Sequence, residues 1–239
     1  MVELGQKRST IREIFEYGKK RAAEIGAENL FDFSIGNPSV PAPDSVRDAV
    51  LHILDTEGPV NSHSYTSAQG DYSVRAALAD SLNRRFGTAF AADNLYLTMG
   101  AAAALSACFK ALAEPEDEFI TIAPFFPEYR CFVKHGAGAK LVVIDADTKH
   151  FQIDFDKLDA AINPHTKAVI INSPNNPSGT VYSEDTIKTL SSLLEEKSRQ
   201  YDHPIFIISD EPYRELVYDG IKIPFITKYY RNTFVCYSY

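Results

Sequence analysis

Five short apolar segments recur along the second half of this 239-residue chain. Two of them read AVIIN and IFIIS, with apolar side chains at consecutive positions rather than at alternate ones. Strands of this composition are buried on both faces, as in a parallel sheet that helices cover on each side. The pattern therefore predicts an α/β fold of three layers with a mostly parallel sheet. The predicted strands are residues 118–123, 140–144, 168–172, 204–209 and 233–238.

Helices and one further strand are predicted around these segments. Residues 94–98 are expected to form a strand, and residues 31–43, with one glycine and three prolines, an extended segment. Asp44 is expected to cap the helix that follows this segment. Apolar residues at helical spacing predict helices at residues 9–26, 44–54, 71–86, 101–113 and 183–200.

Charge and composition narrow the class of protein. The formal net charge is -8, and the Lys and Arg residues are scattered, which argues against a nucleic-acid surface. The chain has no apolar run long enough for a membrane span and begins with charged residues rather than a signal peptide, so a cytoplasmic location is expected. Cys108, Cys131 and Cys236 are interpreted as reduced core residues, and no metal site is expected.

The segment LTMGAAAAL, residues 97–105, joins a predicted strand to an alanine-rich helix through Gly100. Glycine permits a tight turn, and small side chains leave the free N–H groups of the first helical turn open to an anion. Taken alone, the same pattern also fits an ordinary strand-to-helix corner with an alanine-rich packing helix.

The segment INSPNNPSG, residues 171–179, follows a predicted buried strand. It therefore lies at the carboxyl end of that strand, where open α/β sheets bind ligands. After the strand, Asn175, Asn176 and two prolines make a rigid polar loop, which is more constrained than a simple turn requires. The segment is a strong candidate for a binding loop.

A third segment, IISDEPYRE, places Asp210 at the end of another apolar strand. Asp210 is either a solvated loop acid beside Glu211 and Arg214 or a buried acid that faces a cation, which would favour its ionised form. Tyr213 lies three residues further on and could place a phenol in the same cavity.

Two aromatic positions are ambiguous on composition alone. In PFFPEY, residues 124–129, the adjacent phenylalanines fit a core, but Phe126 could also stack on an aromatic ligand. Tyr65 in HSYTSAQG is by itself an exposed tyrosine before a glycine turn.

The order and spacing of these segments resemble the fold type I pyridoxal-phosphate (PLP) dependent aminotransferases of class I/II, the aspartate aminotransferase superfamily. The most specific part is N-N-P-S-G followed about thirty residues later by S-D-E-x-Y, and the resemblance runs from FSIGNP to the terminal YSY. It implies the large-domain fold of that family, PLP as cofactor, and transfer of an amino group between an amino acid and a 2-oxo acid.

The resemblance assigns four residues to the cofactor ring. Asp210 matches the acid that pairs with the ring nitrogen. Asn176 and Tyr213 match the pair that hydrogen-bonds the ring hydroxyl, and Phe126 matches the aromatic residue that stacks on the ring. Asp210 and Tyr213 are thereby the expected catalytic residues of this chain.

The resemblance also implies a phosphate site. Gly100, Ala101 and Ala102 lie where the family has its phosphate-binding amides, and Ser238 matches a phosphate ligand. Many relatives carry a hydroxyl or a lysine in the first of these stretches, whereas this chain offers only backbone donors there. The phosphate is therefore expected to depend more on Tyr65 and Ser238.

Two further residues are matched outside the predicted sheet. Tyr65 matches a tyrosine that reaches the cofactor phosphate of the other subunit, so a homodimer with shared active sites is expected. Gly36, in SIGNP, lies where the family's backbone approaches the substrate carboxylate, and Asn176 is the second expected substrate contact. The amino acid substrate is expected to be aspartate or an aromatic residue.

The resemblance also predicts the organisation of the chain. Residues 1–45 are expected to form an N-terminal arm and small-domain segment, and residues 46–239 the PLP-binding large domain, incomplete at its C-terminal end. In the family spacing the Schiff-base lysine falls two residues beyond Tyr239, so the polypeptide is expected to continue past this residue. The chain as given should bind PLP weakly and should not transaminate.

Other functions share these motifs. Carbon–sulfur lyases, decarboxylases and aminocyclopropane-carboxylate synthases belong to the same superfamily. A PLP-sensing domain of a transcription regulator is an alternative from another class, but no basic DNA-binding segment precedes residue 31.

Overall fold

The computed structural model describes residues 10–34, 36 and 40–239, in a chain that divides into two compact units, residues 1–65 and 66–239. The expected division after residue 45 stays a prediction. In the first unit the described helices are α2 (Thr10–Ile25), the short η1 (Ala27–Asn29), α3 (Asp44–Thr56) and α4 (Gly58–Asn61). Residue 9 and the centre of the segment 31–43 lie outside the described residues.

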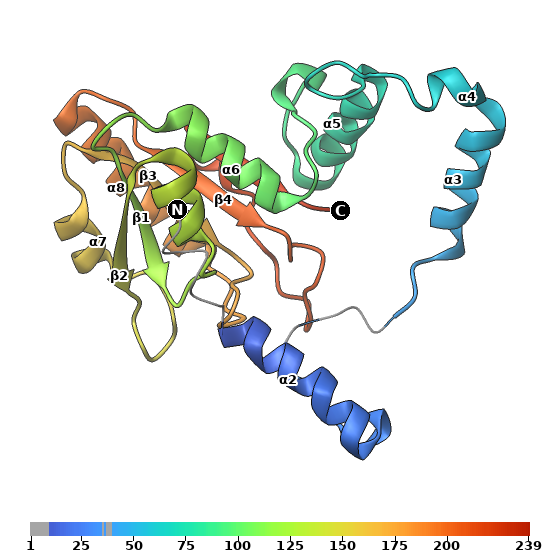
Figure 1. The fold of residues 1–239 in the computed structure, drawn as a ribbon. Helices are drawn as coiled ribbons and strands as arrows, with labels where there is room; N and C mark the ends of the chain where they lie inside the picture. The colour runs from blue at the N-terminus through green and yellow to red at the C-terminus, as the bar shows by residue number, and fades with distance from the viewer. Residues whose placement is uncertain (1–9, 35, 37–39) are drawn as a thin grey trace. The chain divides into compact units, whose positions relative to one another are not determined.

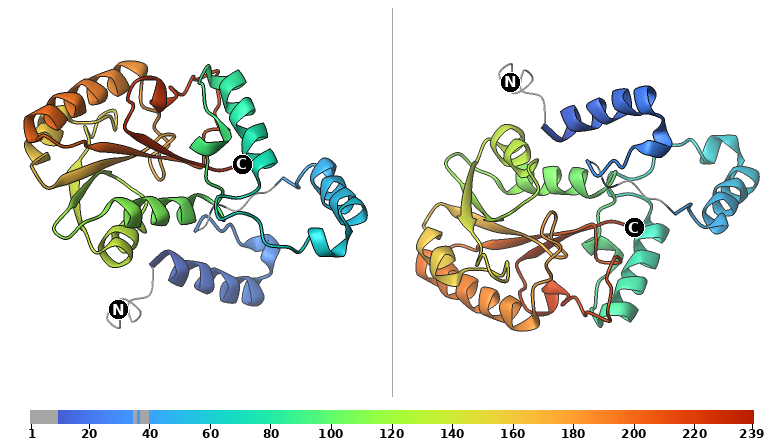
Figure 2. Two further views of the ribbon diagram at one scale, coloured as in Figure 1. Left: turned by 90° about the horizontal axis from the view of Figure 1, so that it is seen from above. Right: turned by 90° about the horizontal axis from the view of Figure 1, so that it is seen from below.

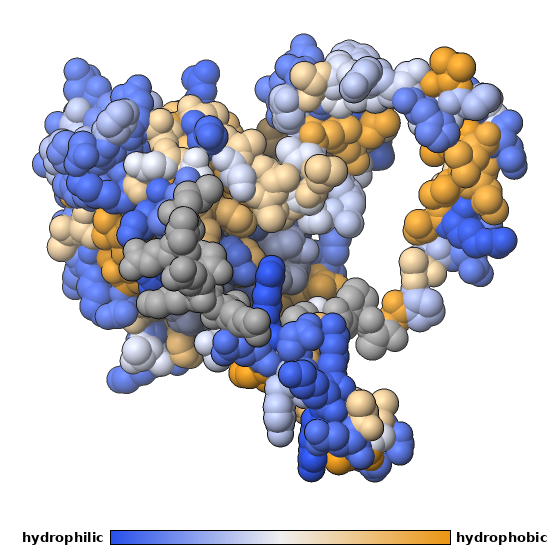
Figure 3. Space-filling view, viewed as in Figure 1, coloured by the Kyte–Doolittle hydropathy of each residue, from blue (hydrophilic) through white to orange (hydrophobic). Residues whose placement is uncertain are grey.

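Helix α3 corrects one expectation. Asp44 is the first residue of the helix rather than its cap, since Pro43 holds the N-cap position and no side chain caps the helix. The helix buries none of its residues. Apolar side chains gather along it, as Figure 3 shows; they are Val46, Val50, Leu51, Ile53 and Leu54.

The second unit is built on a five-stranded sheet in the order β2-β1-β3-β4-β5. Every neighbouring pair is parallel, which confirms the predicted α/β class with a mostly parallel sheet. The predicted strands are found within about two residues of their expected positions. They are β1 (Glu118–Ala123), β2 (Lys140–Asp145), β3 (Thr166–Asn172), β4 (Phe206–Glu211) and β5 (Thr233–Tyr237).

Helices cover both faces of the sheet. Seen from above, α8 (Glu184–Tyr201) lies on one side of the strands and α6 (Ala101–Leu112) on the other (Figure 2). Helix α7 (Phe155–Ala161) packs on the same face as α8, and the π-helical η3 (Cys131–Ala137) packs beside α6 (Figure 1). The remaining helices are α5 (Tyr72–Phe86), η2 (Ala92–Asn94) and η4 (Ile226–Lys228).

The core consists of two clusters, one on each face. Successive residues of β3 alternate between them: Val169 and Ile171 face α7 and α8, whereas Ala168 and Ile170 face α6 and η3. A strand that is buried on both faces needs this continuous apolar sequence, so the AVIIN segment specifies a central position in the sheet. The three-layer arrangement follows from this double burial.

Two expectations for the second unit are wrong. Residues 94–98 are not a strand: Asn94 belongs to η2, and residues 95–98 form no ladder to the sheet. The backbone N–H of Leu97 bonds to Gln69 O at 2.9 Å instead. Cys131 is exposed rather than part of the core. Of the helices in the described part of the chain, none combines the length and apolar character needed to cross a membrane.

Candidate active site

The carboxyl ends of the parallel strands bring the predicted site segments to one edge of the sheet. Phe126 lies in the loop after β1, and Asn176 in the loop after β3. Asp210 is the penultimate residue of β4, Tyr213 follows that strand, and Ser238 follows β5. Because strand ends in a parallel sheet share an edge, these five residues come from segments that converge there.

Asp210 is buried, with 4% of its surface exposed, so it is not a solvated loop acid. Its Oδ2 accepts a hydrogen bond of 2.5 Å from the hydroxyl of Tyr129. Its Oδ1 is buried and has no hydrogen-bond partner. Burial raises the pKa of this carboxyl to about 6, although the bond from Tyr129 opposes the shift. A buried acceptor without a donor is costly in a folded protein, so this oxygen marks a place where a ligand donor fits.

Tyr129 is a site residue that the sequence reasoning missed. Its ring is 1% exposed, meets Phe126 edge-on at 5.7 Å and stacks on Phe125 at 6.2 Å. Burial and the nearby charge of Asp210 raise the pKa of its hydroxyl, which therefore keeps its proton and acts as a donor. It ends the PFFPEY segment, three residues after Phe126, but nothing in that string identifies Asp210 as its partner.

Asn172, the last residue of β3, joins two of the predicted segments. Its Nδ2 donates to the backbone oxygen of Asp210 at 2.8 Å, and its Oδ1 accepts from the backbone N–H of Asn176 at 2.6 Å. Asn176 in turn donates from Nδ2 to the hydroxyl of Tyr213 at 3.3 Å. These three bonds connect the loop after β3 to the end of β4, and they place Asn176 and Tyr213 in direct contact. Their matched role at a ring hydroxyl stays a prediction.

The charged neighbours of Asp210 are engaged with each other. Arg214 forms a buried ion pair with Glu211, which also accepts a bond of 2.7 Å from Ser209. The other nitrogens of Arg214 donate to the backbone oxygens of Ile223 and Pro224, at 3.0 and 2.9 Å. The guanidinium is thus satisfied by Glu211 and by backbone, and it does not serve as the cation for Asp210.

The glycine turn before α6 has the geometry expected of it. Gly100 is the N-cap residue with φ of 82°, a conformation that favours glycine, and a Cβ built there meets no atom within 4 Å. No side chain caps the helix, so the backbone N–H groups of its first residues, Ala101 and Ala102, have no side-chain acceptor. Ser238 is half-buried beyond the end of β5.

Gly36 and Tyr65 belong to the first unit of the chain. Both are exposed: nothing lies within 4 Å of a Cβ built on Gly36, and the Tyr65 side chain is fully accessible. Their matched roles therefore stay predictions.

Comparison with known proteins identifies the family. The sequence profile described as "Aminotransferase class I and II" matches residues 28–239. The chain belongs to this family. Its relatives include a probable aspartate/prephenate aminotransferase of Thermus aquaticus, 30% identical over 84% of this chain and 50% of that protein. The aspartate aminotransferase of Thermotoga maritima is 32% identical over 84% of this chain and 50% of that protein.

Solved structures of aminotransferases share the fold of this family member. An amino transferase from Eubacterium rectale is 66% identical, with a TM-score of 0.97 over 100% of this chain and 60% of that chain. The aspartate aminotransferase of Thermus thermophilus with maleate is 27% identical, with a TM-score of 0.81 over 97% of this chain and 58% of that chain. The chain spans about half the length of the curated relatives it matches.

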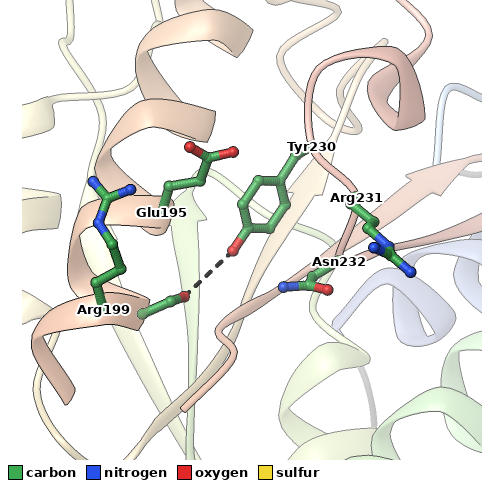
Figure 4. Close-up of a pocket in the computed structure, with 6 residues that line it drawn as sticks. Glu195, Arg199, Tyr230, Arg231 and Asn232 are labelled. Atoms are coloured by element: carbon green, nitrogen blue, oxygen red, sulfur yellow. Dashed lines mark hydrogen bonds between the residues drawn. The ribbon is translucent and has the colours of Figure 1, made fainter. Parts of the chain in front are cut away.

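A hollow in this aminotransferase-family chain lies at the opposite end of the sheet, before β5 and along the last turns of α8. It has a volume of about 440 Å³. The guanidinium groups of Arg199 and Arg231 lie on different sides of the Tyr230 ring and do not converge (Figure 4). The Tyr230 hydroxyl already donates to Ile205 O at 2.6 Å. None of the predicted site residues lines this hollow.

Proposed function

We propose that the protein containing this chain is a PLP-dependent aminotransferase, which moves an amino group between an amino acid, aspartate or an aromatic one, and a 2-oxo acid. The observation that carries the proposal is the buried Oδ1 of Asp210, which has no donor at the carboxyl edge of the sheet. Relatives that share 30–32% of the sequence and are named aspartate or aspartate/prephenate aminotransferases support the substrate class.

The residues at this edge fit pyridoxal phosphate. A buried carboxylate oxygen without a donor suits a protonated ring nitrogen, which would supply both the missing hydrogen bond and a compensating charge. When bound, PLP supplies an electron sink for the substrate's reacting carbon. The pKa of Asp210, raised by burial to about 6, would fall beside such a cation, and the carboxylate would then hold the proton on the ring nitrogen.

Tyr129 fixes the orientation of that carboxylate. By donating to Oδ2, it leaves Oδ1 as the oxygen that faces the ligand. Asn176 and Tyr213, which contact each other at 3.3 Å, would both bond the ring hydroxyl, and Phe126 would pack on the ring face. Each of these side chains would thus hold one edge or face of the cofactor ring.

The phosphate would lie at the first turn of α6. The backbone N–H groups of Ala101 and Ala102, with the open space beside Gly100, suit an anion at a helix N-terminus. Ser238 would add a hydroxyl from the end of β5. Gly36 would approach the substrate carboxylate through its backbone, together with Asn176.

The test uses the full-length protein, including any residues beyond Tyr239. Purified protein is expected to show the absorbance of bound PLP and to form glutamate from 2-oxoglutarate when supplied with aspartate, phenylalanine or tyrosine. Release of pyruvate and ammonia from cysteine-type substrates, without any need for an oxo acid, would instead identify a lyase of the same fold. Absence of PLP binding would contradict the proposal.

We also propose a homodimer in which Tyr65 completes the neighbouring subunit's site. The exposed ring of Tyr65 is available for such a contact. Subunits of Tyr65→Phe and Asp210→Ala proteins would be exchanged: one hybrid site then carries both defects and the other neither. Activity should return in proportion to the hybrids formed, and its failure to return in verified hybrids would argue against shared sites. A cytoplasmic location stays a prediction.

A further inference from the structure

Two cysteines that the proposed reaction does not use lie next to each other in the core of the second unit. Cys108 belongs to α6 and Cys236 to β5, and their sulfur atoms are 4.0 Å apart although 128 residues separate them in sequence. Cys236 is buried, whereas Cys108 is half-buried. Both thiols are free in the structure, and the sequence reasoning did not place them together.

We propose that Cys108 and Cys236 form a dithiol site that hydrogen peroxide oxidises to a disulfide. Cys108 is the attacking group because it is the more exposed of the two. Its sulfur attacks one peroxide oxygen, the O–O bond breaks, and water leaves after protonation, so that Cys108 becomes a sulfenic acid. The sulfur of Cys236 then attacks the Cys108 sulfur, the S–O bond breaks, and a second water leaves. Two thiols are oxidised for each hydrogen peroxide reduced.

The electrostatics of the pair favour this division of roles. The hydrogen bond from Cys236 lowers the pKa of Cys108, and the same bond, together with burial, raises the pKa of Cys236. The charges of Asp210 and Glu211 near Cys236 act in the same direction on its thiol. Cys108 is therefore the sulfur more readily converted to the nucleophilic thiolate, and Cys236 is suited to resolve the sulfenic acid.

The geometry requires only a modest movement. A disulfide has an S–S length of about 2 Å, so the two sulfurs must approach by about 2 Å in total. Both side chains occupy the cluster of buried and partly buried residues between the sheet and α6, and Cys236 lies beside Asp210 in the β4–β5 register. The cross-link would join α6 to β5 and close a loop across most of the second unit.

The chain contains its own control. Cys131 is exposed and lies in η3, and the structure describes no second thiol next to it. It should therefore be modified by peroxide without forming the internal cross-link. Its oxidation in the same sample shows that the dose of peroxide was sufficient.

The experiment treats folded, full-length protein with hydrogen peroxide, blocks the remaining thiols with N-ethylmaleimide, and digests without reduction before mass spectrometry. A peptide pair linking Cys108 to Cys236 is expected, with the mass of two hydrogens lost, and it should disappear on reduction. Cys131→Ser should leave its yield unchanged. Cys236→Ser should abolish it and leave Cys108 as a sulfenic or higher acid, whereas in Cys108→Ser protein the buried Cys236 should stay a thiol.

The opposite results would overturn the proposal. One is oxidation of Cys131 without any Cys108–Cys236 linkage. Another is a linkage that forms only in denaturant. In both cases circular dichroism of the untreated protein verifies that it was folded. Accumulation of sulfenic acid on Cys108 in the unsubstituted protein would also overturn it, since Cys236 would then not resolve the intermediate. None of these readouts depends on cofactor binding, so they are independent of the proposed aminotransferase function.

Discussion

The two ends of the sheet in the second unit differ in how their polar groups are satisfied. At the carboxyl end, Asp210 is buried with one oxygen bonded to Tyr129 and the other without a donor. At the amino end, Tyr230 is equally buried, but its hydroxyl donates to Ile205 O, and the nearby Arg231 is exposed to solvent. The carboxyl end has a buried acceptor without a donor, whereas the buried hydroxyl of Tyr230 at the amino end is paired.

The difference shows that the size of a hollow is a poor guide to function in this fold. The hollow beside Tyr230 has a volume of about 440 Å³, yet its two arginines point apart and its buried hydroxyl is already paired. The carboxyl end is identified instead by an unsatisfied acceptor and by three loops that meet around it. Burial of a charge without a partner is expensive, so such a group persists where a ligand supplies the partner.

The largest expected effect comes from removing the charge at the carboxyl end. Asp210→Asn in the full-length protein should lower turnover by about 10³-fold, because the amide cannot hold a proton on the ring nitrogen. The matched control is Asp202→Asn at the other end of the sheet, an exposed aspartate with φ of 58° that asparagine adopts readily. Its turnover should stay within about twofold. Equal losses in steady-state assays of both variants would remove the distinction between the two ends.

Asp210→Asn lowers turnover, but in cofactor-free protein it should raise stability relative to wild type as pH rises. The pKa of Asp210 is about 6 in the folded protein, above its ordinary value of 3.8. The protonated carboxyl therefore stabilises the folded state fully below pH 3.8, and this stabilisation is lost as pH rises through about 6. The full loss amounts to about 3 kcal/mol. Urea unfolding of cofactor-free protein between pH 4.5 and 7.5 should therefore show wild type losing stability relative to Asp210→Asn. Parallel pH profiles would indicate that Asp210 is better solvated than its burial implies.

Removing the hydroxyl that orients Asp210 should have a smaller effect. Tyr129→Phe deletes a bond to a charged oxygen, which is typically worth about 1.5–3 kcal/mol, so turnover should fall at least about tenfold. Because this bond lowers the pKa of Asp210, its loss should also move the acidic limb of the pH–rate profile to higher pH. A lower rate with an unshifted profile would mean that Tyr129 acts only through packing.

The fold was largely predictable because burial on both faces leaves a direct mark on sequence. Segments such as AVIIN are apolar at consecutive positions, and each became a strand of the sheet. The predicted strand at residues 94–98 was wrong because a short apolar run alone does not show where its backbone hydrogen bonds are made. Leu97 bonds to Gln69 outside the sheet, and Tyr96 and Met99 are exposed.

The sequence names candidate site residues only where a motif is contiguous. Asn176, Asp210 and Tyr213 stand in strings that mark strand ends, and two of them do contact each other. Tyr129 was missed because its partner is 81 residues away in sequence, and a pairing across the sheet leaves no local pattern. The same reason hid the contact between Cys108 and Cys236.

Loss of a neutral hydrogen bond at the carboxyl end should lower turnover less than Tyr129→Phe does. Tyr213→Phe removes the acceptor for Asn176 Nδ2, a bond of 3.3 Å between groups that are only partly buried. A neutral bond of this kind contributes about 1 kcal/mol, so turnover should fall about fivefold. Titration of PLP into cofactor-free protein should show a comparable loss of affinity. A Tyr213→Phe protein with unchanged affinity and turnover would exclude Tyr213 from the cofactor's surroundings.

The smallest effect on turnover is expected from the hydroxyl at the other end of the sheet. Tyr230→Phe is the counterpart of Tyr129→Phe, since both tyrosines are at most 3% exposed and donate bonds of similar length, 2.6 and 2.5 Å. Removing it leaves the buried oxygen of Ile205 without that donor, which should lower the free energy of unfolding by about 1–3 kcal/mol. Turnover per folded molecule should nevertheless stay within about twofold of wild type. Urea unfolding and steady-state assays on the same preparation separate the two quantities, and a turnover loss as large as that of Tyr129→Phe would show that the amino end of the sheet also takes part in the reaction.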